Sequence, residues 1–186
     1  MSISLLCDAA DSVLVVIDIQ ERLAKAMPEK PLRRLVERTS MLIQAANLLG
    51  VPVLRTEQYP KGLGPTLSDI EQHLHNDQKM EKTCFACSEA SGFAQALQET
   101  RRRQVVLTGM ESHVCVLQTA LGLQAAGHQV FVVGDAVCSR HKANHKNALQ
   151  RMAHSGVVIS NSESVMFEWL RDSRHEQFKT ISTLLR

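Results

Sequence analysis

The stretch LTGMESHVCVLQTALGLQAAG, residues 107–127, runs from the end of an apolar segment through Gly109 into a helical pattern that contains Cys115. A strand that passes directly into a helix is typical of α/β proteins. The cysteine stands about where the helix begins, and two interpretations are open. A buried cysteine is most often a small core residue, whereas a thiol at a helix N-terminus has a lowered pKa and can act as a nucleophile.

The same alternation of strand and helix extends over the rest of the chain. Apolar segments predict strands at residues 12–20, 51–56, 79–83, 104–109, 128–136 and 157–160. Helical spacing of apolar residues predicts helices at 31–50, 64–74, 91–101, 113–127 and 141–156, with one or two more after 160. This alternation indicates βαβ units and a parallel sheet covered by helices on both faces.

The predicted fold is therefore α/β: a Rossmann-like three-layer αβα sandwich with a mostly parallel six-stranded sheet in the order 3-2-1-4-5-6. With 186 residues and no repeat or linker, the chain fits a single domain over residues 1–186. In such a sheet, ligands bind beyond the carboxyl ends of the strands, near the switch in strand order. The candidates are the residues that follow the strands: Asp18, Glu57 to Tyr59, Lys82, the Gly109–Cys115 turn and Asp135.

Composition limits the kind of partner. A formal net charge of +2 is too small to indicate nucleic-acid binding, and the three arginines at 101–103 are typical of a solvated helix end. The longest apolar runs, at 13–17 and 130–133, fall far short of the roughly 20 residues of a membrane-spanning helix. We therefore expect neither a nucleic acid nor a membrane as partner.

The N-terminus and the cysteines predict a compartment. Residues 1–12 have no basic start and no long apolar segment, which predicts that there is no signal peptide. The cysteines are odd in number and irregularly spaced: Cys7, Cys84, Cys87, Cys115 and Cys138. This pattern favours a cytoplasmic protein with reduced thiols over a disulfide framework.

Three side chains at the predicted carboxyl edge could act together. Asp18 ends the first strand and would neighbour the end of the fourth, where a carboxylate could take the proton of Cys115 and later return it to a leaving group. Lys82 could fix that carboxylate and add positive charge near the thiolate. Backbone N–H groups of the 109–115 turn could bind the oxyanion of a tetrahedral intermediate. Each side chain also has an ordinary interpretation, as a core cysteine, a turn-forming aspartate or a surface lysine.

Four motifs make the sequence resemble the isochorismatase-like cysteine hydrolase superfamily, which includes nicotinamidases and carbamoyl-amide hydrolases. They are VLVVIDIQ with Asp18, EKTCFAC with Lys82, GMESHVCVLQTAL with Cys115, and VFVVGDAVCSR at 130–140. The stretch RTEQYPKGLGPT at 55–66 and the tail EQFKTISTLLR are most similar to the isochorismatase domain-containing subgroup. The motifs occur in the order and at the distances that the resemblance requires, and they cover most of the chain.

The resemblance implies a catalytic triad of Asp18, Lys82 and Cys115. It also implies a non-proline cis peptide between Met110 and Glu111, and an oxyanion hole made by the backbone N–H groups of Glu111 and Cys115. Residues that follow the first three strands are further expected to contact a small-molecule substrate: Gln20, Gln58, Tyr59 and Phe85.

A departure from the superfamily bears on metal binding. Nicotinamidases place an Asp/His metal cluster after the second strand, but here no histidine occurs between Arg55 and Leu67. We therefore expect no metal and no other cofactor. Isochorismatases cleave a vinyl ether and need no cysteine, so Cys115 favours acyl chemistry on an amide or ureide through a Cys-thioester intermediate.

Other candidate motifs have simpler explanations. Cys84 and Cys87 have the CxxC spacing of a redox pair or half a zinc site, but no second pair follows and core packing is favoured. His141 and His145 lie one helical turn apart without the glutamate of a metalloprotease motif, which predicts a solvated helix face. His113 lies two residues before Cys115 and could pair with it or cap the helix.

The favoured function is a hydrolase that cleaves a C–N bond in a small molecule. The alternative is a non-catalytic oligomeric protein that binds a small molecule or serves as a scaffold, and a third possibility is a thiol-redox protein using Cys84 and Cys87. The apolar-rich helices and the long C-terminal segment favour a homo-oligomer.

Overall fold

A parallel sheet forms the centre of the computed structural model, which describes residues 6–75 and 77–185. The prediction about a signal peptide concerns residues 1–12, of which the first five lie outside the described residues. The strand order is β3-β2-β1-β4-β5-β6, and every pairing between these strands is parallel. The strands are β1 (Ser12–Ile17), β2 (Val53–Gln58), β3 (Gln78–Lys82), β4 (Gln104–Met110), β5 (Gln129–Cys138) and β6 (Val158–Ser160). The predicted fold class and strand order are confirmed.

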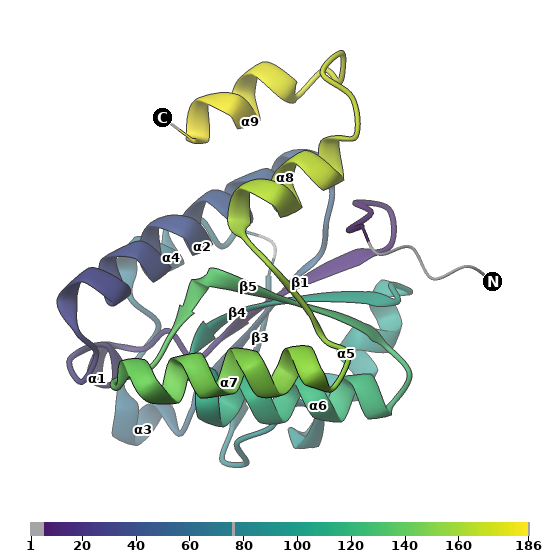
Figure 1. The fold of residues 1–186 in the computed structure, drawn as a ribbon. Helices are drawn as coiled ribbons and strands as arrows, with labels where there is room; N and C mark the ends of the chain where they lie inside the picture. Colours follow the sequence, from purple (N-terminus) through teal and green to yellow (C-terminus); the bar gives the residue numbers. More distant parts are fainter. Residues whose placement is uncertain (1–5, 76, 186) are drawn as a thin grey trace.

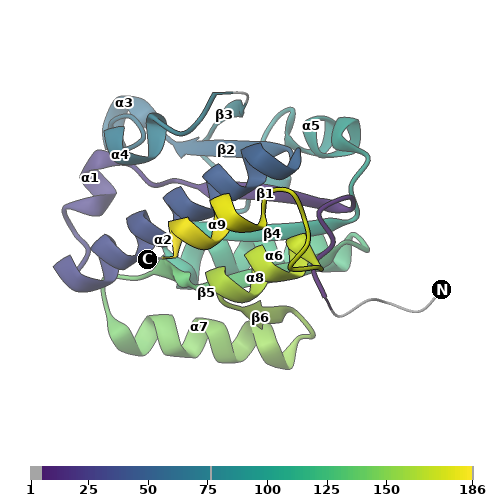
Figure 2. The same cartoon turned by 90° about the horizontal axis from the view of Figure 1, so that it is seen from above.

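Helices cover both faces of the sheet (Figures 1 and 2). One face carries α2 (Glu29–Leu49) and α8 (Ser162–Leu170), with α9 (Phe178–Leu184) outside them, and the other carries α5 (Phe93–Thr100), α6 (Leu117–Ala125) and α7 (Lys142–His154). Short helical turns occupy the connections: α1 (Glu21–Ala24), α3 (Pro60–Leu63), α4 (Ser68–Glu71), the 3-10 turn η1 (Cys87–Glu89) and the π-helical turn η2 (Ser112–Val116). Within the described ranges, no helix has both the length and the apolar character needed to cross a membrane.

The two central strands are buried along their whole length. Every residue of β1 and of β4 is buried, as expected for strands in the middle of a parallel sheet. Their side chains alternate, so that Leu14 and Val16 pack towards α2 while Val13 and Val15 pack towards α5 and α6. Both strands are therefore held rigidly, and so are the residues that follow them at the carboxyl edge.

Two acidic residues expected at that edge have structural roles instead. β5 continues to Cys138, two residues beyond its predicted end, so Asp135 lies inside the strand. Its carboxylate accepts hydrogen bonds from the backbone N–H and hydroxyl of Ser162, at 2.8 and 2.7 Å, at the first residue of α8. Glu57 is likewise buried within β2, where it accepts hydrogen bonds from the backbone and hydroxyl of Thr66.

Gly109 allows β4 to approach β1 closely. Its φ is +119°, and an added Cβ would overlap the backbone carbonyl of Ile17. We expect Gly109→Ala to destabilise the fold by at least about 3 kcal/mol. The added methyl group would fit beside the Ile17 carbonyl only if the pairing of the two central strands were broken. Gly50 is the matched control, since its φ is +67° but nothing lies within 4 Å of an added Cβ. Gly50→Ala should cost only about 1–2 kcal/mol; equal losses in urea denaturation would contradict this explanation.

Candidate active site

Asp18 follows β1 at the middle of the carboxyl edge. Its backbone is in the left-handed region, with φ of 51°, and its side chain is fully buried. The Thr56 hydroxyl donates a hydrogen bond to Oδ1 at 2.8 Å, and the Lys82 ammonium donates one to Oδ2 at 2.6 Å. The two carboxylate oxygens are held by different partners, so the orientation of the group is fixed.

Lys82 ends β3, which is separated from β1 by β2, and its side chain has no exposed surface. The ammonium donates to Asp18. It also donates to the backbone carbonyls of Cys84 and Phe85, at 3.3 and 3.2 Å. It also lies 3.6 Å from Sγ of Cys115. Burial acts against the charged form, but attraction to negatively charged neighbours, Asp18 foremost, outweighs it and raises the pKa of Lys82. A charged ammonium therefore links the carboxylate to the thiol.

Cys115 is the fourth residue of η2, which leads directly into α6. Its side chain is 5% exposed. Burial, followed by the negative charge of Asp18, raises the pKa of the thiol to about 12, and Lys82 only partly opposes them. The lowered pKa that the helix start suggested is therefore wrong for the empty site, because desolvation and a neighbouring carboxylate outweigh the helix dipole.

The turn between β4 and Cys115 is held by an ion pair that the sequence analysis missed. The Met110–Glu111 peptide bond is cis, as expected. The nearly buried Glu111 carboxylate accepts hydrogen bonds from Nη2 of Arg140 at 2.6 Å and from its backbone N–H at 3.0 Å. Burial acts to raise the pKa of Glu111, but these bonds outweigh it and hold the pKa below its usual value. Arg140 ends the fourth motif, and nothing in its spacing signalled a partner in the turn.

Hydrogen bonds from α7 and from the residues before it hold the same turn. Ser112 is hydrogen-bonded to Nδ1 of His145 at 2.9 Å, and His113 is hydrogen-bonded to Ser139 at 3.0 Å and to Asn144 at 3.3 Å. His113 therefore has partners other than Cys115. The prediction of a fully solvated helix face is wrong at His145, which is partly buried against the turn.

The loop after β2 is tied to the end of β1 through Gln20. This side chain is fully buried, and its amide donates to the backbone carbonyls of Gln58 and Gly64 at 3.1 and 2.7 Å. Its carbonyl accepts from the backbone N–H of Gln58 at 2.7 Å. Gln20 therefore holds the loop rather than facing open space. Gln58 in turn accepts a hydrogen bond from the Lys82 ammonium at 2.6 Å.

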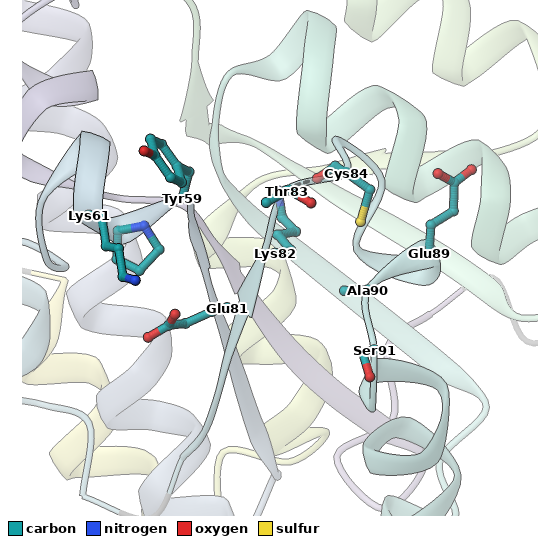
Figure 3. Close-up of a pocket in the computed structure, with 10 residues that line it drawn as sticks. Tyr59, Lys61, Glu81, Lys82, Thr83, Cys84, Glu89, Ala90 and Ser91 are labelled. Carbon is teal, nitrogen blue, oxygen red and sulfur yellow. Dashed lines mark hydrogen bonds between the residues drawn. The ribbon is translucent and has the colours of Figure 1, made fainter.

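An open cavity of about 450 Å³ lies beside the end of β3 (Figure 3). Tyr59 and Lys61 lie on one side of the strand, and Cys84, Glu89 and Ser91 on the other. Of the predicted substrate contacts, Tyr59 lines this cavity, whereas Gln20, Gln58 and Phe85 are not among its described lining residues. The lining of this cavity includes Lys82 but neither Asp18 nor Cys115, both of which are buried.

Thr56 and Cys87 extend the network behind Asp18. The Thr56 hydroxyl, which is bonded to Asp18, lies 3.6 Å from Sγ of Cys87. Cys87 is fully buried, and its backbone N–H donates to the hydroxyl of Thr119 at 2.8 Å. All five cysteines are free thiols. Among the described residues, no group of three or more histidine, cysteine, aspartate or glutamate side chains is arranged to hold a metal ion.

The Asp18–Lys82 pair predicts a measurable stability effect. We expect Lys82→Met to lower the free energy of unfolding by about 3–5 kcal/mol, because it leaves a buried carboxylate without its counter-charge. The double variant Asp18→Asn/Lys82→Met should recover a large part of that loss. Lys146 is exposed, so Lys146→Met should change stability by less than about 0.5 kcal/mol. Denaturant titration measures all three, and a double variant as unstable as Lys82→Met would contradict the charge explanation.

The chain is similar to known proteins over most of its length. Residues 12–164 match the family model described as the isochorismatase domain. Isochorismatase domain-containing protein 2A of Mus musculus is 36% identical over 180 residues, which cover 94% of this chain and 82% of the mouse protein. The structure of the MAR1 ribonuclease of Caenorhabditis elegans superposes with a TM-score of 0.91 at 33% identity, covering 97% of this chain and 92% of that one.

Two more distant structures share the fold. The Escherichia coli YcaC protein, described as an octameric hydrolase of unknown specificity, has a TM-score of 0.89 at 21% identity over 100% of this chain and 91% of its own. The N-carbamoylsarcosine amidase of Thermoplasma acidophilum has a TM-score of 0.71 at 21% identity over 82% of this chain and 97% of its own. At these identities the likeness concerns the fold alone.

Proposed function

The chain belongs to the isochorismatase family, and from this premise we propose that it is a cysteine hydrolase that cleaves a C–N bond in a small amide or ureide. The observation that carries the proposal is the position of the Lys82 ammonium, 2.6 Å from the carboxylate of Asp18 and 3.6 Å from the sulfur of Cys115. A buried acid, cation and thiol at these distances are suited to nucleophilic acyl transfer.

Acylation begins with proton transfer from Cys115 to Asp18. The sulfur attacks the carbonyl carbon, and the backbone N–H groups of Glu111 and Cys115 bind the oxyanion. Asp18 then gives its proton to the leaving nitrogen, the C–N bond breaks, and a thioester to Cys115 remains. Lys82 keeps the carboxylate oriented and offsets the negative charge on the sulfur.

Hydrolysis of the thioester uses the same carboxylate. Asp18 takes a proton from a water molecule, which attacks the thioester carbonyl. The C–S bond breaks, Cys115 regains its proton from Asp18, and the acid is released. Amide and water are thus converted to acid and amine without a metal ion.

The raised thiol pKa determines when the proton moves. With a pKa of about 12, Cys115 is protonated in the empty site at neutral pH. The thiolate therefore forms only as the sulfur attacks, when the charge passes to the carbonyl oxygen and the N–H groups of the turn. A buried, protonated thiol is also protected from reaction with other electrophiles.

Relatives support this reaction class and an oligomeric assembly. One fold neighbour is an amidase by name, and another is described as an octameric hydrolase. We accordingly propose a homo-oligomer that acts on a small molecule. The five free cysteines support a reducing compartment such as the cytoplasm.

A panel of primary amides, ureides and carbamoyl compounds tests the proposed function. We expect release of ammonia or amine from at least one compound, with the acyl group detected on Cys115 by mass spectrometry in a rapidly quenched sample. An RNA oligonucleotide in the same panel tests the activity named for the C. elegans protein. Saturable binding without turnover of any compound would instead favour the non-catalytic small-molecule binder.

A further inference from the structure

A second cavity of about 540 Å³ lies at the carboxyl end of β5. It lies between the starts of α2 and α7, which cover opposite faces of the sheet and begin at the same end of it (Figures 1 and 2). Its lining residues come from those two helix starts and from the end of β5: Pro28, Pro31, Arg34, Val137, Cys138, Ser139, Lys142 and His145. None of them belongs to the proposed active site.

The charge in this cavity is positive and unpaired. Arg34 and Lys142 line it, and no carboxylate is among its described lining residues. Across residues 6–75 and 77–185, neither cation forms an ion pair with an acidic side chain. Burial and the nearby Arg34 lower the pKa of His145, so Arg34 and Lys142 supply the permanent charge at neutral pH. Two unpaired cations facing one cavity favour an anionic ligand.

The backbone adds to the positive potential. Both α2 and α7 begin at the cavity, with Pro28 and His141 as N-caps, and neither N-cap side chain accepts a hydrogen bond from its helix. Helix N-termini carry partial positive charge and favour anions. These helices have 21 and 13 residues. Glu29 in the first turn of α2 offsets part of the α2 dipole, whereas α7 has no acidic residue in its first turn and its dipole adds to the charge of Arg34 and Lys142.

The inner surface of the cavity is largely apolar. Val137 and Cys138 are buried at its floor, and Pro28 and Pro31 form part of the rim. Ser139 adds one hydroxyl, which is bonded to His113. A ligand that matches this surface has a charged end near the cations and a short apolar body against the floor.

We propose that this cavity binds a small organic carboxylate with a short apolar body. The carboxylate lies between Arg34 and Lys142 at the two helix starts, and the body packs on Val137, Cys138 and the prolines. This binding site is distinct from the cavity beside β3 and is connected to the catalytic turn by the hydrogen bond between His145 and Ser112. A bound carboxylate would therefore contact a residue that braces the turn containing Cys115.

Titration calorimetry with hexanoate tests the site. We expect saturable binding with a Kd of about 1 mM or tighter, no binding of 1-hexanol, and weaker binding of inorganic phosphate, which lacks the apolar body. The double variant Arg34→Gln/Lys142→Gln should weaken hexanoate binding at least 10-fold. The matched control is Arg33→Gln/Lys146→Gln, which removes two exposed cations of the same helices that do not line this cavity; its Kd should stay within 2-fold.

Several outcomes would overturn the proposal. They are an absence of saturable hexanoate binding, equal weakening in both double variants, phosphate binding as tight as that of hexanoate, or equally tight binding of 1-hexanol. Cys115→Ala should bind hexanoate with the wild-type Kd, and loss of binding there would place the ligand at the proposed active site instead. Because the experiment measures binding and not turnover, its outcome is independent of whether the chain is a hydrolase.

Discussion

Cys115→Ala is expected to abolish turnover of any amide that the wild-type protein hydrolyses, lowering kcat/KM by about 10⁴-fold or more. The reason is that alanine has no nucleophile, while the neighbouring Asp18 and Lys82 remain in place. The acyl adduct on the protein should disappear at the same time. Both results are measured on one sample, by product release and by intact-protein mass spectrometry.

A matched thiol controls for general damage to the fold. Cys7 is fully buried and Cys115 is nearly so, but Cys7 lies near the start of the described chain, where its backbone N–H donates to Glu168. Cys7→Ala should retain turnover within about 2-fold, with a modest loss of stability from the small cavity it leaves. Residual turnover in Cys115→Ala above about 1% of the wild-type value, or an adduct on another cysteine, would rule out the proposed mechanism.

Asp18→Asn should change two properties of the site in opposite directions. Turnover should fall by about 10²–10⁴-fold, because no carboxylate remains to carry the proton between sulfur, leaving group and water. Thiol alkylation should become faster. The negative charge of Asp18 is, after burial, the largest cause of the raised pKa of Cys115; its removal lowers that pKa, and a larger fraction of the sulfur is thiolate at any given pH below it.

Iodoacetamide labelling of Cys115 across pH 7–10, followed by mass spectrometry, measures this effect. At each pH, Cys115 should be labelled faster in Asp18→Asn than in the wild type, while Asp69→Asn, which changes an exposed carboxylate on α4, should leave the rate unchanged. A variant that loses turnover but labels no faster than the wild type would show that Asp18 does not act on the thiol electrostatically. A thiol that labels readily at pH 7 in the wild type would contradict a buried, protonated Cys115.

The sequence predicted the fold well because its signals are local and repeated. Alternating strand and helix patterns indicated a parallel sheet, and the carboxyl-edge rule directed attention to Asp18, Lys82 and the turn before Cys115. Whether these side chains lie close together depends on the strand order, and the spacing of apolar residues does not reveal that order. The resemblance to a known family supplied the triad, and the structure brings those three side chains together.

The predictions that were wrong concern residues whose role depends on tertiary contacts. Asp135 and Glu57 look like site residues in the chain, but each accepts hydrogen bonds that hold a neighbouring segment. The direction of the Cys115 pKa shift could not be predicted, because a helix start is visible in a sequence and the depth of burial is not. Arg140 and Thr56 were missed for a related reason, since each acts on the site through a partner that is distant in the chain.

The strand order also makes the site a reporter of complete folding. Lys82 lies on the edge strand β3, and it reaches Asp18 across β2 from 64 residues away in the chain and Cys115 from 33 residues away. Contacts between such distant segments form only after long loops have closed, which makes them slow relative to helix formation. An intermediate with helices but without the docked edge strand would leave Cys115 unpaired and open to labelling. The decline of Cys115 labelling during refolding should therefore follow the recovery of helical signal, and it should mark the moment when the last parallel pairings are made.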